Sequence, residues 1–306
     1  MKAFVFANYQ EKFNELNKKL NWEQIKFQSI KFKNGEGKIV IKNSVKDEDV
    51  IIFSDFSYST SYKYLSKKRK YSKDEYNVEL KRLISALDNP KSITLYLPLM
   101  YQSRQNAENE KESKDFLLFV NELVNLKVNK IITFEAHGND EEITSYSLSK
   151  IFTNRKYDVV VSPDAGGYSR AKEYSKTLKC EDTCFKKMRD LSTFVDGSNP
   201  INKYQKSRYD FTNKNVLIVD DILDSGKTII NAIERIDNAS KIDVFVTYPL
   251  FSKGVKEFKK LYKSKKLNKL YISDLIHIDN NILKYDFIEV VNTDFLVCEI
   301  LKGVGK

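Results

Sequence analysis

Residues 215–230 read NVLIVDDILDSGKTII. The apolar run VLIV has the composition of a buried strand, and Asp220 and Asp221 follow it directly. The short loop DSGKT comes next and leads into a helix that is predicted to begin near Thr228. A strand, a polar loop and a helix in direct succession are typical of α/β proteins.

The same succession recurs along the chain. Apolar runs alternate with charged segments such as residues 75–87 and 113–126, whose apolar spacing suits one buried helical face. This alternation predicts an α/β fold with mostly parallel sheets flanked by helices. At 306 residues the chain is long enough for two domains, predicted at 1–150 and 151–306, with the last helix packing back on the first domain. The predicted strands lie in KIVIKN, DVIIFSD, SITLYLPL, KIITFEAH, YDVVVSPDAGG, NVLIVDDILD, KIDVFVTYPL and LYISDLIHI.

Polar residues follow several of these strands, as in FEAHGND, VSPDAGG and VDDILDSGKT. In open α/β sheets, ligands bind beyond the carboxyl ends of the strands. We therefore expect the chemistry of the protein at these three segments.

The letters GKT invite interpretation as a nucleotide-binding P-loop. Such a loop needs a glycine five positions before the glycine of its GK pair, so that backbone N–H groups can wrap the phosphates. Asp221 occupies that position relative to Gly226. Because a carboxylate there would repel a polyphosphate, the P-loop interpretation is excluded.

The loop instead suits a single phosphate monoester. The backbone amides of residues 225–228, two hydroxyls and the positive end of the helix would hold the phosphate, while the aspartates accept hydrogen bonds from sugar hydroxyls. An N-cap beside a solvated acidic turn is the alternative interpretation. The predicted sugar-phosphate site contains Asp220, Asp221, Asp224, Ser225, Gly226, Lys227 and Thr228.

A family resemblance rests on several segments. VLIVDDILDSGKT resembles the ribose-phosphate-binding motif of type I phosphoribosyltransferases and of ribose-phosphate pyrophosphokinases. YDVVVSPDAGGYSRAKEYSKTL is similar to the VVSPDxGGxxRA segment of the pyrophosphokinases. FKNGEGKIVI, YLPLMYQSRQ and TFEAHG are similar to their FxDGE, ARQ and DLHA segments. The matches follow the family order from about residue 30 onward, and simple phosphoribosyltransferases lack the N-terminal half, so the chain resembles the pyrophosphokinase family.

The resemblance implies two phosphoribosyltransferase-like domains and a reaction. The family transfers the diphosphoryl group of ATP to the anomeric hydroxyl of ribose 5-phosphate, with Mg²⁺ and cationic side chains in place of a covalent nucleophile. CFKKMRD aligns with the catalytic loop and places Lys187 and Arg189 on its two cations. His137 and Asp164 match positions associated with Mg²⁺ and substrate. Since Mg²⁺ prefers oxygen ligands, Asp164 is the expected direct ligand, with His137 alternatively on the ATP phosphates.

The ATP side is implied by two further matches. Arg104 and Gln105 match the ATP-binding Arg-Gln pair, and Phe32, Asn34 and Glu36 match a hairpin that contacts adenine from a neighbouring subunit. Without the resemblance, the hairpin residues form an ordinary turn. The functional interpretation implies a homo-oligomer in which one subunit completes the site of another.

The chain departs from the family pattern at several positions. The Asp-Arg that follows the Arg-Gln pair is Asn106 and Ala107, so one cation near ATP is lost. Glu135, Ala165, Met188 and Lys227 also differ from the usual residues. Since divergent phage members use ADP-ribose and make ADP-ribose pyrophosphate for rebuilding NAD⁺, ADP-ribose is an alternative acceptor. A non-catalytic regulatory homologue and a true phosphoribosyltransferase are the remaining alternatives.

The composition limits partners and location. The net charge of +10 fits nucleic acid, polyanionic metabolites or a lysine-rich coding bias, and a nucleic-acid role is the less favoured interpretation because no basic run interleaved with stacking aromatics stands out. Three cysteines and two histidines argue against a disulfide framework and a structural zinc site. The sequence shows no signal peptide or membrane span, so we expect a cytoplasmic protein.

Overall fold

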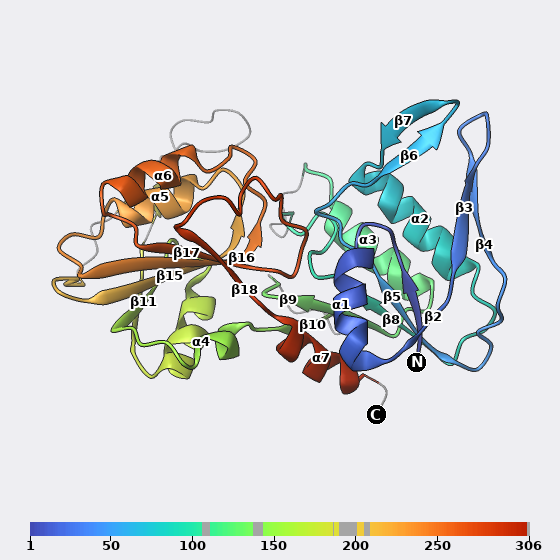
Figure 1. The fold of residues 1–306 in the computed structure, drawn as a ribbon, viewed down its shortest axis with the longest axis horizontal. Coiled ribbons are helices and arrows are strands. Elements are labelled where there is room, and N and C mark those ends of the chain that lie inside the picture. The colour runs from blue at the N-terminus through green and yellow to red at the C-terminus, as the bar shows by residue number, and fades with distance from the viewer. Residues whose placement is uncertain (106–110, 137–142, 186, 190–200, 205–208, 305–306) are drawn as a thin grey trace. The chain divides into compact units, whose positions relative to one another are not determined.

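The structure, a computed structural model, describes residues 1–105, 111–136, 143–185, 187–189, 201–204 and 209–304, and only the backbone of 187–189 and 201–204. The chain folds into two compact units, coloured along the sequence in Figure 1. The first contains Met1–Tyr146, Leu275–His277 and Asp294–Lys306, and the second contains Ser147–Asp274 and Ile278–Thr293.

The first unit is built on a six-stranded sheet in the order β10-β9-β8-β5-β1-β2, in which neighbouring strands are parallel. Its strands are β1 (Lys2–Val5), β2 (Glu23–Gln24), β5 (Asp49–Phe53), β8 (Ser92–Tyr96), β9 (Lys130–Phe134) and β10 (Ile143–Tyr146). Two hairpins stand apart from the sheet: β3 (Phe27–Lys31) with β4 (Gly37–Ile41), and β6 (Ser61–Tyr64) with β7 (Lys67–Lys70). The helices are α1 (Gln10–Leu20), α2 (Lys73–Ser85), α3 (Asp115–Asn125) and α7 (Asp294–Lys302).

Alternation along the strands explains how helices cover both faces of this sheet. Val50 and Ile52 belong to a buried cluster with apolar residues of α2 and α3. Phe53 points to the opposite face, where its ring lies 5.0 Å from that of Phe13 on α1. Because both faces are buried, β5 reads as a continuous apolar run, as the sequence predicts.

The second unit repeats the plan with the order β12-β11-β15-β16-β17-β18, again parallel throughout. Its strands are β11 (Val159–Ser162), β12 (Glu181–Cys184), β15 (Asn215–Leu223), β16 (Lys241–Pro249), β17 (Lys269–Ser273) and β18 (Ile288–Val291). A separate antiparallel pair is formed by β13 (Lys187–Arg189) and β14 (Ile201–Tyr204). The helices are the 3-10 turn η1 (Ser149–Phe152), α4 (Tyr168–Leu178), α5 (Lys227–Ile233) and α6 (Lys256–Lys263).

The central strand of the second unit is longer than predicted. β15 continues through both aspartates to Leu223, because β16 runs equally far and supplies backbone partners as far as Pro249. Apolar residues of α5 and α6 cover one face of the sheet, and Tyr174 of α4 covers the other together with Phe152. The predicted α/β class with two mostly parallel sheets is confirmed. Within the described residues, no helix is long and apolar enough to span a membrane.

Candidate functional site

Two acids near the end of β15 share one buried arginine. Arg170, on the first turn of α4, places its guanidinium nitrogens 3.6 Å from Oδ1 of Asp220 and 3.4 Å from Oδ2 of Asp221. The arginine side chain is only 6% exposed, and those of the aspartates are 15% and 12% exposed. Since β11 and β15 are neighbours, the helix that follows β11 delivers Arg170 to the end of β15.

The electrostatics of this cluster leave excess negative charge. Burial raises the pKa of Asp220 well above its ordinary value of 3.8, and the neighbouring Asp221 and Asp164 carboxylates raise it further, against the opposing effect of Arg170. One guanidinium thus faces several carboxylates. The arrangement is suited to receiving hydroxyl donors or a cation, both of which favour the ionised aspartate.

The turn between β11 and α4 forms one side of the cluster. The Gly167 N–H donates to Oδ1 of Asp164 at 3.2 Å, and Oγ of the buried Ser162 donates to the Asp164 carbonyl at 2.6 Å. A Cβ on Gly167 would lie 2.9 Å from the Ser162 hydroxyl and 3.0 Å from a guanidinium nitrogen of Arg170. Glycine at position 167 therefore allows the turn to close against the arginine that the aspartates share.

The predicted phosphate loop follows β15 directly. The structure places Asp224 and Ser225 in the loop as half-buried residues, and α5 begins at Lys227, one residue before the predicted start. Gly226 is the N-cap residue and has φ of +76°, a conformation that favours glycine. Because Gly226 has no side chain, it makes no side-chain capping hydrogen bond to the helix.

Backbone hydrogen bonds from a neighbouring segment hold the start of the loop. The backbone N–H of Ser252 donates to the Asp224 carbonyl at 3.0 Å, and that of Phe251 donates to the Leu223 carbonyl at 2.9 Å. Lys227 is exposed and Thr228 is half-buried. The predicted phosphate-binding residues thus directly follow the strand that carries Asp220 and Asp221.

The hairpin predicted to contact adenine is formed by β3 and β4 in the first unit. The turn between β3 and β4 is closed by the Phe32 N–H, which donates to the Glu36 carbonyl at 2.8 Å. The Asn34 amide donates to the Glu36 carboxylate at 2.9 Å, and the ring of Phe32 is 44% exposed. The turn thus leaves Phe32 partly exposed, with the Lys38 ammonium 5.6 Å from the centre of its ring.

The structure describes only some of the remaining residues predicted to bind ATP or to act in catalysis. Arg104 and Gln105 are exposed and precede a segment outside the described residues. The Gln105 amide is engaged at the start of α3, where it accepts from the Asp115 N–H and donates to the Asp115 carboxylate, both at 3.1 Å. His137 lies outside the described residues. Lys187 and Arg189 belong to β13, but their side chains are also outside the description.

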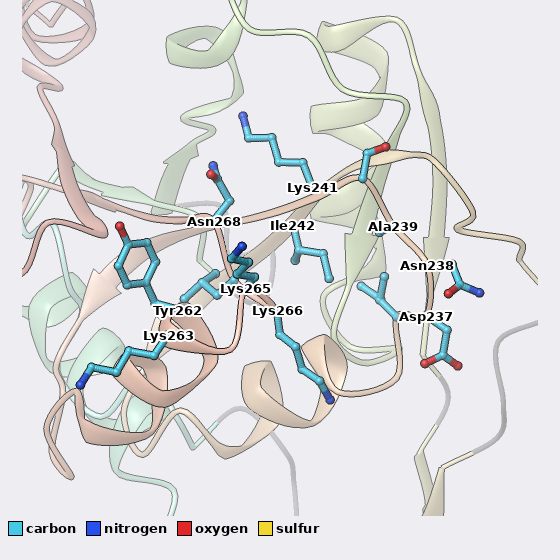
Figure 2. Close-up of a pocket in the computed structure, with 13 residues that line it drawn as sticks. Asp237, Asn238, Ala239, Lys241, Ile242, Tyr262, Lys263, Lys265, Lys266 and Asn268 are labelled. Carbon is cyan, nitrogen blue, oxygen red and sulfur yellow. The ribbon is translucent and has the colours of Figure 1, made fainter.

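A cavity at the opposite edge of the second sheet does not belong to this site. It has a volume of about 690 Å³ and is lined by the turns that precede β16 and β17 (Figure 2). The side chains of Lys241, Lys263 and Lys266, which line the cavity, point in different directions. It therefore offers no converging set of cations for a phosphate.

Sequence interpretation missed one residue of the cluster. Arg170 belongs to the quoted YSRAKEY segment but carried no predicted role, because its contacts depend on β11 and β15 being neighbours. The spacing from Gly167 could have indicated Arg170. Residues three apart lie on the same face of a helix, so Arg170 lies on the same face as Gly167 at the helix start.

Both halves of the chain match models of known protein families. A model described as the N-terminal domain of ribose phosphate pyrophosphokinase matches residues 1–125, and one described as a phosphoribosyl transferase domain matches residues 135–280. The chain belongs to the ribose-phosphate pyrophosphokinase family. The predicted family resemblance is thereby confirmed. The enzyme class is confirmed with it, since this is a diphosphotransferase family.

Members of the ribose-phosphate pyrophosphokinase family resemble the chain along most of its length. The enzyme of that name from Mycoplasma genitalium is 27% identical over 281 residues, covering 85% of this chain and 78% of the relative. The one from Agrobacterium fabrum is 26% identical over 294 residues, covering 90% and 87%. A crystal structure of phosphoribosylpyrophosphate synthetase from Mycobacterium smegmatis has a TM-score of 0.80 at 19% identity and covers 99% of this chain and 98% of its own, which confirms the fold.

Proposed function

We propose that this chain transfers the diphosphoryl group of ATP to the anomeric hydroxyl of a ribose phosphate. The observation that carries the proposal is the sharing of Arg170 by Asp220 and Asp221 beside the Gly226 loop. Family membership supplies the reaction type, and this cluster supplies a polar edge of suitable chemistry for a phosphorylated sugar.

In the proposed reaction, the anomeric oxygen forms a bond to the β-phosphorus of ATP. The bond from that phosphorus to the oxygen bridging the α- and β-phosphates breaks, AMP leaves, and the hydroxyl proton passes to water. Asp220 and Asp221 would orient the sugar hydroxyls, while the loop of Ser225 and Thr228 holds the phosphate. Lys187 and Arg189 would neutralise charge on the transferring group, and they need no covalent intermediate to do so.

The residues present fit a magnesium ion. Burial raises the pKa of Asp220 most, and the Asp221 and Asp164 carboxylates raise it further against the effect of the single guanidinium, so a divalent cation would stabilise the ionised aspartates. Among the described residues no group of three or more His, Cys, Asp or Glu is placed to hold a metal ion by itself. Mg²⁺ usually takes one or two carboxylates together with waters and substrate phosphates, so Asp164 would hold the ion together with the bound substrate. When bound, the ion would counter the negative charge of the phosphoryl oxygens.

The ATP-binding role of Arg104, Gln105 and His137 follows from the family match alone. The hairpin role has structural support as well, because Phe32 is exposed on a turn fixed by Asn34 and Glu36. An aromatic face that projects from its own subunit is suited to the nucleotide of a neighbour. We therefore include a homo-oligomer with shared sites in the proposal.

Ribose 5-phosphate is the leading acceptor, and ADP-ribose is the second candidate. The exposed Lys227 favours the second, since it adds a cation beside the loop that a bridging diphosphate would use. The two acceptors share the anomeric hydroxyl at which the reaction occurs. Their difference lies only at the 5′ end, which faces the loop in the proposed pose.

The test is AMP release from ATP and Mg²⁺ with each acceptor in turn. Production of AMP with ribose 5-phosphate supports the leading proposal, and production only with ADP-ribose reassigns the acceptor. Absence of AMP with both overturns the enzymatic proposal and favours a regulatory homologue. A transferase would instead release pyrophosphate from phosphoribosyl pyrophosphate and a base. Lys187→Ala should abolish turnover, and full activity in that variant would remove the catalytic assignment.

A further inference from the structure

The β6–β7 hairpin is a basic element attached to the adenine hairpin. Residues 61–70 read SYKYLSKKRK and contain no carboxylate. All four residues of β7 are exposed, and among the described residues neither Lys67 nor Arg69 forms an ion pair. The hairpin therefore carries unneutralised positive charge on a short pair of strands.

The register divides the hairpin into two faces. Tyr62 pairs with Arg69 and Tyr64 with Lys67, so these four side chains share one face. Lys63 and Lys68 pair on the other face. The hairpin thus offers exposed cations on two opposite faces.

The face with the tyrosines is the one turned toward the body of the first unit. The Tyr62 hydroxyl donates to the Glu75 carboxylate of α2 at 2.8 Å, and burial raises the pKa of Tyr62 to about 12, so it remains a neutral donor. The Tyr64 hydroxyl donates to the Lys33 carbonyl at 2.8 Å, and Lys33 is the residue after Phe32. One tyrosine therefore ties the basic hairpin to the adenine turn.

Arg69 contacts the ring of the same tyrosine. Its guanidinium carbon lies 5.0 Å from the centre of the Tyr64 ring. The Tyr64 side chain thus lies between the exposed Arg69 guanidinium and the turn that contains Phe32. Figure 1 shows the two hairpins projecting next to each other. A base stacked on Phe32 would have its phosphates within reach of this charge, since a nucleotide is an aromatic group joined to anions by one sugar.

We propose that Arg69 and Lys67 bind the phosphates of the nucleotide whose base contacts Phe32. This inference rests on the proposed adenine role of the Phe32 turn. Arg69 presents a planar fork that matches phosphate oxygens, and Lys67 adds a point charge beside it.

The experiment measures dissociation constants of the full-length protein by calorimetry with two probes. One is α,β-methylene ATP, whose bridging carbon prevents cleavage, and the other is AMP. Arg69→Gln should weaken binding of the triphosphate analogue about tenfold, because a hydrogen bond to a charged group is lost, and should change AMP binding less than twofold. Lys68→Gln, on the opposite face, is the matched control and should leave both constants unchanged.

The outcomes separate this inference from the proposed function. If Phe32→Ala weakens both probes while Arg69→Gln changes neither, the phosphate role is overturned and the adenine role stands. If Phe32→Ala changes neither probe, the adenine role fails and the inference with it. An equal loss in Arg69→Gln and Lys68→Gln would show general surface charge and overturn the specific assignment. Arg69→Lys, which keeps the charge but not the fork, should give an intermediate loss.

Discussion

Gly226 lies directly against the ring of Phe258, so that a Cβ at position 226 would be 2.6 Å from Cε2 of that ring. Phe258 is a buried residue of α6, with 1% of its surface exposed. The predicted phosphate loop therefore packs directly against the core of the second unit.

Gly226→Ala should damage both stability and acceptor binding. The residue has φ of +76°, and an alanine would add backbone strain of about 1 kcal/mol to the clash with Phe258. Gly254→Ala is the control, since Gly254 has φ of +68° but a Cβ there would meet no atom within 4 Å. Urea unfolding should show a larger loss for Gly226→Ala than for the control. Equal losses would mean that the ring moves aside and does not fix the loop.

Arg170→Met should destabilise the second unit strongly. Removal of one partner from a buried ion pair typically costs about 3–5 kcal/mol, because the remaining charges stay buried without compensation. Here the remaining charges are those of Asp220 and Asp221. Lys260→Met provides the comparison, since its pair with Glu257 is exposed and should contribute less than about 0.5 kcal/mol. Chemical denaturation at pH 7 measures both, and similar values for the two variants would contradict the expectation.

Asp220→Asn should change the pH dependence of unfolding. The pKa of Asp220 is raised in the folded state, so the folded chain holds this proton more tightly than the unfolded chain. The free energy of unfolding therefore falls as the pH rises from the ordinary pKa of 3.8 to the raised pKa of the folded state. At higher pH this loss of stability remains. Asparagine removes that loss, so the stability of the variant relative to the natural chain should increase over this pH range. Parallel stability curves for the two proteins would rule out the raised pKa.

A mixture of two inactive variants should recover activity. Lys187→Ala removes a proposed catalytic cation, and Phe32→Ala removes the proposed stacking face. If the turn serves a neighbouring subunit, random mixing of equal amounts creates roughly a quarter of sites with both elements intact. AMP release by the reassembled mixture, compared with each variant alone, measures this recovery. A mixture no more active than its components would place Phe32 in the site of its own subunit, or in none.

The main strands could be predicted because each is buried on both faces. DVIIFSD and KIITFEAH contain β5 and β9, where continuous apolar composition reflects contact with helices above and below the sheet. KIVIKN was also predicted as a strand, but as β4 it pairs only with β3 in a separate hairpin. Local composition does not reveal which partner a strand finds.

The β6–β7 hairpin could not be predicted, because KKRK has no apolar residue to mark a strand. Its conformation depends on distant contacts, from Tyr62 to Glu75 and from Tyr64 to the Lys33 carbonyl. The same limit applied to Arg170, whose role follows from strand order. Residues of the Gly226 loop were accessible from sequence because they are consecutive, whereas the counter-charge of the acids comes from another helix.

Helix α7 joins the first unit although it is the last element of the chain. Lys12 of α1 and Asp294 of α7 form an ion pair at 2.5 Å, and the Cys298 thiol lies 3.8 Å from the Leu16 carbonyl. During synthesis, the first unit therefore emerges from the ribosome without one of its helices and must wait for nearly the whole chain before it can close. Until then, the surface of α1 that α7 will cover stays exposed, so this unit should be the one that molecular chaperones protect in the newly made protein.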